Sequence, residues 1–256
     1  MFKFVKSAAV AAIVAGAFAS SLASAATTYI VGTGATYRPF EFETPNKELV
    51  GFDVDLMKAI AKEAGFEVKF INTPWDGIFN TVKNGDRDII MSGITITDQR
   101  KAEVDFSKPY FLAHQLILTN KNLKISSLAD LKGKLIAVVN ASAGDIAASN
   151  AFGKASPNIR RFDNTPLAIE ELFNGGVDAM IGDVGVLQYY VTQNPDKQFN
   201  QCRDPSFQEQ YFGIGVRKGN QKVLDDVNLG LQKAIDSGAY AEVYKKWFGG
   251  EAPKLP

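Results

Sequence analysis

Short apolar runs alternate with amphipathic segments along most of the chain, and this alternation limits the folds that it can adopt. Residues 135–139 read Leu-Ile-Ala-Val-Val, which is typical of a strand covered on both faces of a parallel sheet. Residues 53–64 instead carry apolar side chains at helical spacing, with Asp53 placed to cap the helix and Gly65 to end it. The repeated strand–helix–strand order predicts an α/β protein with parallel sheets.

The first residues have the three-part pattern of a secretory signal peptide. Lys3 and Lys6 form a positive region, residues 7–22 are almost all small or apolar, and Ala23-Ser24-Ala25 offers a cleavage site. We expect cleavage after Ala25 and export to the periplasm. A transmembrane anchor is the alternative, but the apolar run is short and alanine-rich and no cluster of charges follows it.

Two strand–helix runs are joined by extended segments, so we expect two lobes. No glycine- and serine-rich linker separates them, which favours a hinge over a loose tether. The expected organisation is a signal peptide at 1–25, a first lobe at 26–109 and 212–256, a second lobe at 115–206, and hinge strands at 110–114 and 207–211.

Charge and composition exclude several classes of function. The 28 basic and 28 acidic residues balance, and loss of Lys3 and Lys6 with a signal peptide leaves a net charge near −2, unlike a nucleic-acid binder. Cys202 is the only cysteine, so no internal disulfide can form. His114 is the only histidine, so we expect no histidine-based metal site, no metal ion and no cofactor.

The strongest functional cluster follows the strand expected at 89–91 and reads Ser-Gly-Ile-Thr-Ile-Thr-Asp-Gln-Arg from Ser92 to Arg100. Ser92 and Thr95 offer hydroxyl groups, and Gly93 lets a ligand approach the backbone closely. Arg100 supplies a planar fork that matches a carboxylate. Loops at the carboxyl ends of parallel strands are where α/β proteins bind ligands. A helix cap followed by a solvated arginine is the alternative interpretation.

Four motifs in order along the chain carry a family resemblance. They are residues 51–56 (GFDVDL), 93–100 (GITITDQR), 105–110 (DFSKPY) and 244–249 (YKKWFG). Together they resemble the polar amino-acid family of bacterial extracellular solute-binding proteins, close to the arginine-, lysine/histidine- and glutamine-binding members. The resemblance implies a two-lobed periplasmic binding protein fold with two hinge crossings and a ligand in the cleft.

The resemblance also implies roles for individual residues. Arg100 would hold the carboxylate of a free L-amino acid, assisted by Thr95 and the backbone around Gly93. Asp183 would pair with the α-ammonium group. An acid at the carboxyl end of a strand also faces the crevice on topological grounds, although Asp183 could instead cap the helix that starts at Val184.

Further residues match the family around the ligand's side chain and in the second lobe. Tyr37 and Trp75 correspond to aromatic residues that sandwich the side chain, with ordinary core packing as the alternative. Ser142 and Ala143 lie in the turn that clasps the carboxylate, where small residues before a helix make an anion nest. Many relatives carry threonine where Ala143 stands, so Ser142 or backbone N–H groups would take over that contact.

Gly34 is the most informative departure, because many glutamine and basic-residue binders have aspartate at this position to recognise the ligand's side chain. The absence of an aspartate here weakens the assignment of a basic ligand. Candidates to replace this acid are Glu41, Asp145 and Asp163.

The sequence therefore predicts a substrate-binding protein of an amino-acid ABC importer that binds arginine, lysine, histidine or glutamine. The expected partners are the free L-amino acid and a membrane permease. We expect a monomer that binds no nucleic acid. The alternative is a periplasmic arogenate or prephenate dehydratase on the same fold, but no acid–base pair beyond the binding set supports an enzyme.

Overall fold

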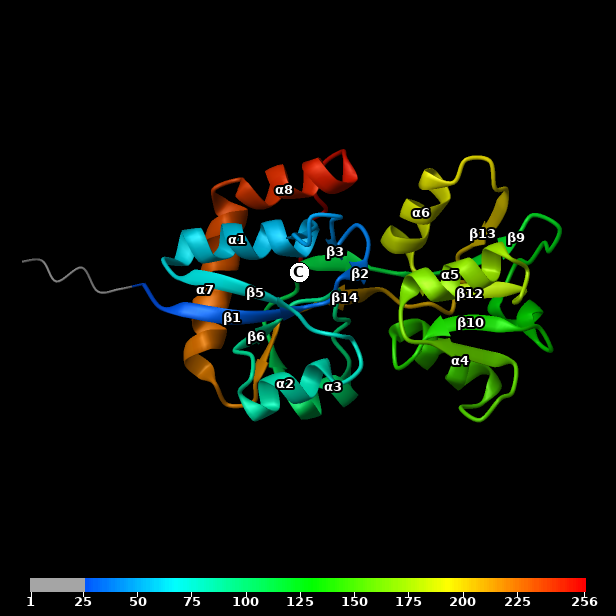
Figure 1. The fold of residues 1–256 in the computed structure, drawn as a ribbon, viewed down its shortest axis with the longest axis horizontal. Coiled ribbons are helices and arrows are strands. Elements are labelled where there is room, and N and C mark those ends of the chain that lie inside the picture. Colours follow the sequence, from blue (N-terminus) through cyan, green and yellow to red (C-terminus); the bar gives the residue numbers. More distant parts are fainter. Residues whose placement is uncertain (1–25) are drawn as a thin grey trace, which may run out of the picture.

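The computed structural model describes residues 26–256, and it confirms the expected α/β fold of two lobes (Figure 1). The expected signal peptide at 1–25, with its cleavage site after Ala25, lies outside the described residues. Within residues 26–256, no helix has the length and apolar character needed to span a bilayer.

The first lobe is built on a five-stranded sheet in the order β5–β1–β6–β15–β7, which helices cover on both faces (Figure 1). Its strands are β1 (Thr28–Thr33), β5 (Glu67–Asn72), β6 (Ile89–Ile90), β7 (Val104–Phe106) and β15 (Gly215–Arg217). Its helices are α1 (Phe52–Ala64), α2 (Ile78–Asn84), α3 (Asp98–Glu103), α7 (Gln221–Asp236) and α8 (Ala239–Phe248). A small sheet on the side facing the other lobe comprises β2 (Thr36–Tyr37), β3 (Glu41–Glu43) and β4 (Leu49–Val50).

The second lobe repeats this design with a sheet in the order β11–β10–β12–β9–β13. Its strands are β9 (Gln115–Asn120), β10 (Ile136–Val139), β11 (Ile159–Phe162), β12 (Ala179–Asp183) and β13 (Phe199–Cys202). Its helices are α4 (Ala143–Phe152), α5 (Thr165–Phe173) and α6 (Val184–Gln193), together with a 3₁₀ turn at Leu128–Leu131. Ser127 and Asp130 form a capping box at the start of that turn.

The expectation of parallel sheets is only half right, because both sheets are mixed. In each lobe four strands run in one direction and one strand runs against them: β15 in the first lobe and β9 in the second. Each of these two strands directly follows an extended segment that crosses between the lobes, so the chain enters the sheet there without a helical crossover. The alternation of strands and helices in the sequence does not predict the direction of these strands.

Two strands cross between the lobes and pair with each other. β8 (Phe111–Ala113) and β14 (Gln210–Phe212) are antiparallel, with Phe111 opposite Phe212. The rings of these two residues stack with centroids 5.6 Å apart, and both belong to an aromatic core that includes Phe40 and Phe52 of the first lobe. The crossing strands are therefore anchored to the first lobe, and we propose residues 110–114 and 207–211 as the hinge.

Helix α1 starts differently from the sequence expectation. Gly51, not Asp53, is the N-cap residue, and Asp53 is a buried residue of the first turn whose carboxylate points to neighbouring segments. The expected end is confirmed, since Gly65 takes a left-handed conformation and its N–H donates to the carbonyl of Ala61. The misassigned Asp53 becomes important for the chemistry behind the cleft.

Candidate ligand-binding cleft

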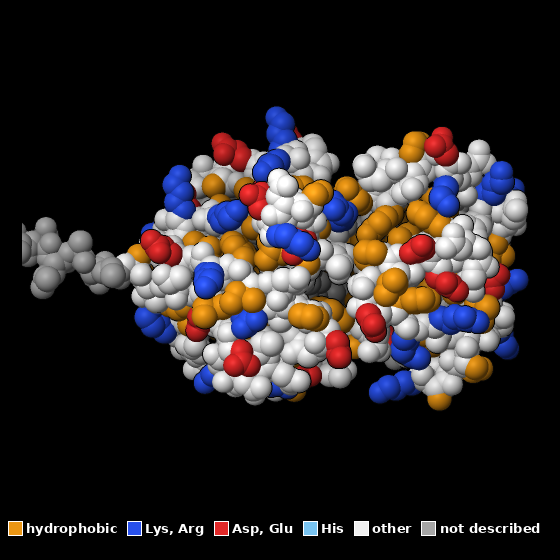
Figure 2. Space-filling model, viewed as in Figure 1, with side chains coloured by type: hydrophobic (Ala, Val, Ile, Leu, Met, Phe, Trp, Pro, Cys, Tyr) orange, Lys and Arg blue, Asp and Glu red, His pale blue; other side chains and the backbone are white. Residues whose placement is uncertain are grey.

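A cavity of about 450 Å³ lies between the two lobes, within the size range of small-molecule sites. Figure 2 shows the hollow between them on one face. The residues that follow the carboxyl ends of β1, β6, β10, β11 and β12 all contribute to its wall, as expected for α/β sheets. All nine residues singled out from the sequence line this cavity: Tyr37, Trp75, Ser92, Gly93, Thr95, Arg100, Ser142, Ala143 and Asp183.

Arg100 supplies the buried positive charge of the cleft. Its side chain is 5% exposed and comes from α3, which Thr97 caps by accepting the N–H of Arg100. Nη1 donates to the carbonyl of Thr95 at 2.8 Å, and Nη2 donates to the carbonyl of Ala141 in the other lobe at 3.0 Å. None of the ion pairs among residues 26–256 involves Arg100. Burial lowers its pKa to about 10, so it stays charged at neutral pH.

Asp183 supplies the matching negative charge from the second lobe. Its oxygens accept hydrogen bonds from the hydroxyl of Tyr37 across the cleft and from Nε2 of Gln115 at 2.8 Å. The residue occupies the N-cap position of α6, but its side chain makes no capping bond, so the alternative role as a helix cap is wrong. Burial raises the pKa of Asp183 to about 6, against the opposing effects of Tyr37, Gln115 and Arg100.

Trp75 contacts both lobes across the cleft. Its ring centroid is 5.1 Å from the guanidinium carbon of Arg100, which gives a cation–π contact. Its Nε1 donates to the carbonyl of Asn140 in the second lobe at 2.9 Å. This bond, the Tyr37–Asp183 bond and the Arg100–Ala141 bond are three hydrogen bonds that cross the cleft directly. The two lobes are therefore in contact in this structure.

The turn before α4 forms the second-lobe wall. The hydroxyl oxygen of Ser142 accepts the N–H of Asp145 at 3.2 Å as the cap of α4, and its hydrogen remains a donor for the cavity. Ala143 is the first helical residue, at the positive end of the helix. Asp145 does not line the cavity, because it pairs with Arg161 at 2.9 Å behind the turn.

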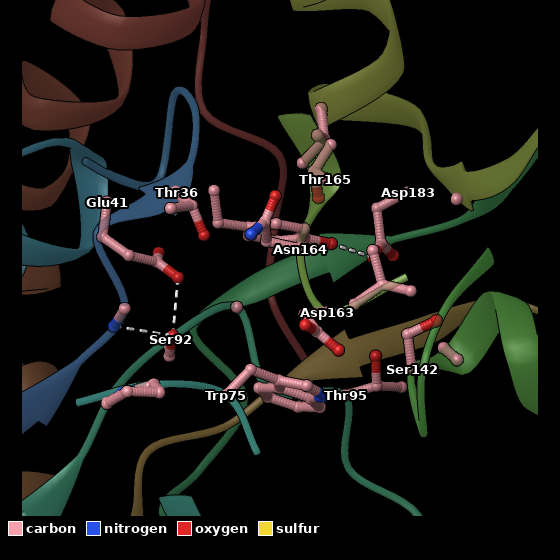
Figure 3. A pocket seen from close by; sticks show the side chains of 18 of the residues that line it. Thr36, Glu41, Trp75, Ser92, Thr95, Ser142, Asp163, Asn164, Thr165 and Asp183 are labelled. Carbon is pink, nitrogen blue, oxygen red and sulfur yellow. Dashed lines mark hydrogen bonds between the residues drawn. The ribbon is translucent and has the colours of Figure 1, made fainter. Parts of the chain in front are cut away.

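Two acids line the cavity, and they were among the candidates to replace the missing aspartate at Gly34. Glu41 is fully buried on β3, and its Oε1 accepts the hydroxyl of Ser92 at 2.6 Å. Asp163 is exposed and follows β11 (Figure 3). The N–H of Gly93 is not available to a ligand, because it donates to Asp53 at 2.8 Å.

Sequence reasoning missed Gln115, which bonds to Asp183 from outside the lining, and the polar lining residues Thr36, Asn72, Asp76, Asn164 and Thr165. Gln115 orients Asp183, but it lies in a crossing segment that carries no motif. Asn164 lines the cavity and caps α5 through the N–H of Leu167. The signal for Asn164 was present, because it follows the carboxyl end of β11 and precedes the helix start at Thr165-Pro166.

Two α/β lobes, two crossing strands and a charged cleft between them define a two-lobed solute-binding protein. The model of the family described as "Bacterial extracellular solute-binding proteins, family 3" matches residues 29–250. The chain belongs to this family.

Individual relatives agree with this assignment. The chain is 43% identical over 230 residues to the "Probable histidine-binding protein" of Neisseria gonorrhoeae, covering 88% of this chain and 86% of that protein. The structure of the arginine-, lysine-, histidine-binding protein ArtJ from Geobacillus stearothermophilus superposes with a TM-score of 0.85 at 44% identity, covering 89% of this chain and 97% of that one.

A third comparison bears on the alternative that the chain is a dehydratase. The structure of the ancestral amino acid-binding protein AncCDT-1, a precursor of cyclohexadienyl dehydratase, matches with a TM-score of 0.77 at 40% identity, covering 86% of this chain and 95% of that one. All three relatives are named as binding proteins, so the chain is a binding protein rather than an enzyme.

The geometry around Asp183 predicts an unusual titration. In the native chain the carboxyl of Asp183 should titrate near pH 6, and Tyr37→Phe should raise this pKa further because it deletes a hydrogen bond that stabilises the carboxylate. Carboxyl ¹³C NMR measures both values. Tyr189→Phe, on α6 but outside the cavity wall, is the matched control and should leave the pKa unchanged. A native value near the ordinary 3.8 would show that the carboxyl is not held as described.

Proposed function

We propose that the protein binds a free L-amino acid between its lobes and delivers it to the membrane permease of an ABC importer. The observation that carries the proposal is that Arg100 and Asp183 line one cavity from opposite lobes, with charges suited to the two ends of a zwitterion. Charge-assisted hydrogen bonds of this kind contribute about 1.5–3 kcal/mol each. In this proposal Arg100, with Ser142 and the N–H groups at the start of α4, holds the carboxylate, and Asp183 holds the ammonium group.

The wall between these anchors suits a polar or basic side chain. Tyr37 and Trp75 provide aromatic faces for an aliphatic stem or a cation, and Glu41 and Asp163 provide acids in the same cavity. Arginine, lysine, histidine and glutamine all fit this pattern. We favour a basic ligand, because two acids line the cavity and two of the three relatives compared are named for histidine or for arginine, lysine and histidine.

Binding of this kind couples to lobe closure, because the anchors come from different lobes. A ligand shifts the equilibrium only by binding the closed form more tightly than the open one. We propose that the protein acts in the periplasm as a monomer after cleavage of residues 1–25, with no nucleic acid as a partner. The family and the balanced charge of the chain support this setting.

Titration calorimetry against each of the standard amino acids tests the proposal. At least one basic amino acid should bind with a dissociation constant near or below micromolar, which corresponds to about −8 kcal/mol. Arg100→Ala should weaken that binding at least about 100-fold, since it removes the charge-assisted bonds to the carboxylate. Arg160→Ala, an exposed arginine of the second lobe, is the control and should bind normally. Absence of binding by every amino acid would refute the function, and full affinity in Arg100→Ala would refute the carboxylate site.

Trp75 provides a separate test of closure. Trp75→Phe keeps an aromatic ring but removes the Nε1 bond to Asn140 in the other lobe, so ligand affinity should fall about fivefold, or about 1 kcal/mol. Trp247→Phe removes a similar bond, from Nε1 to Asp55 at 2.8 Å, within the first lobe only. It should leave affinity unchanged in the same calorimetric measurement. Equal affinities for the two variants would show that the cross-cleft bond does not favour the closed form.

A further inference from the structure

Two carboxyl groups lie side by side where the first lobe meets the cleft, without a neighbouring cation. Glu41 is 0% exposed and Asp53 is 1% exposed. One oxygen of each is well satisfied: Oε1 of Glu41 accepts the hydroxyl of Ser92, and Oδ2 of Asp53 accepts Gly93 N–H at 2.8 Å and Tyr110 OH at 2.9 Å. The other two oxygens, Oε2 and Oδ1, have no hydrogen-bond partner among the described residues.

A single proton accounts for both unpaired oxygens. Two carboxylates buried in contact cannot both carry charge at modest cost, and a proton on one of them makes a hydrogen bond to the other. Burial, the charge of Asp53 and a hydrogen bond with Asp53 raise the pKa of Glu41 well above its ordinary range, against the effect of Ser92. Asp53 has two donors to stabilise its charge, and burial raises its pKa only to about 7. The proton therefore resides on Glu41 and the charge on Asp53.

The other titratable groups packed around the pair stay neutral. Burial raises the pKa of Tyr37 and of Tyr110 well above the ordinary value, and neighbouring acids raise them further. Among residues 26–256, no lysine or arginine forms an ion pair with Glu41 or Asp53. The pair thus lacks an internal cation that would let both carboxyl groups ionise.

Of the two acids, only Glu41 lines the cavity. The neighbouring Gly34 leaves space in front of it, since a Cβ atom at that position would lie 3.1 Å from Oγ of Ser92 and 3.6 Å from Oε1 of Glu41. In Figure 3, Glu41 and Ser92 form one side of the site, facing the side that carries Asp183 and Ser142. A ligand side chain that extends toward the first lobe therefore meets the protonated member of the pair.

We propose that Glu41 is the residue that distinguishes cationic from neutral ligand side chains, and that seating a cation against it expels the proton shared with Asp53 to the solvent. The ligand's charge replaces that of the proton, so Glu41 and Asp53 become ionised together. A neutral side chain leaves the proton in place. This inference rests on the proposed function, because it requires an amino acid in the cleft.

Proton counting by calorimetry tests the inference. Arginine and its neutral isostere citrulline are titrated at pH 8 in two buffers of different ionisation enthalpy. At this pH Asp183, with a pKa of about 6, is already ionised and contributes no proton. Arginine should release about one proton more than citrulline, and its affinity should rise up to about tenfold per pH unit while Glu41 holds the proton in the free protein.

Two variants locate the proton. Glu41→Gln keeps the size of the side chain and should abolish the extra proton released by arginine and flatten the pH dependence. Asp163→Asn, which removes the exposed acid of the same cavity, should still release the proton. If Glu41→Gln does not fold, the comparison of arginine with citrulline decides. If citrulline does not bind, the comparison of Glu41→Gln with the native chain decides.

The outcomes separate this inference from the function on which it rests. Arginine binding with no net proton release, or with the same release from Glu41→Gln as from the native chain, overturns the proton exchange and leaves the amino-acid receptor standing. Failure of arginine, lysine and histidine alike to bind overturns both the proton exchange and the assignment of a cationic ligand, while binding of glutamine in the same series would preserve the receptor. If lysine or histidine binds and arginine does not, the same proton count is made with that ligand.

Discussion

The buried guanidinium of Arg100 is the constraint on which the rest of the cleft depends. A buried cation costs several kcal/mol of desolvation unless hydrogen bonds and an anion compensate it. Its partners in the protein are two carbonyl oxygens and the aromatic ring of Trp75, which orient the group without neutralising it. The carboxylate of Asp183 lies across the cleft and affects the pKa of Arg100, but the two form no ion pair. The arrangement therefore matches a ligand with its own carboxylate and ammonium groups.

Topology explains why these groups meet. Parallel strands bring their carboxyl ends to one edge of each sheet, and two crossing strands place those edges opposite each other. The stacked rings of Phe111 and Phe212 fix the crossing to the first lobe, and Gln115, just beyond it, orients Asp183. The crossing segments and the cleft are thus parts of one hydrogen-bonded unit, and this unit is the physical route that we propose from ligand binding to closure.

Much of this could be predicted from the sequence, and the failures have physical causes. The alternation of strands and helices, the end of α1 at Gly65 and the cluster from Ser92 to Arg100 are local signals, and all are found in the structure. The antiparallel strands of the mixed sheets and the bonds across the cleft depend on long-range pairing, which no local pattern encodes. Asp53 illustrates the problem: an acid at a helix start resembles a cap, yet its true partners lie 40 and 57 residues away.

The most direct test of the central claim is a crystal structure of the protein with the amino acid that it binds most tightly. The account predicts one ligand enclosed between the lobes, with its α-carboxylate against the guanidinium of Arg100 and its α-ammonium group against the carboxylate of Asp183. A ligand bound outside this cleft, or bound inside it with these two ends making no contact with Arg100 and Asp183, would contradict the account.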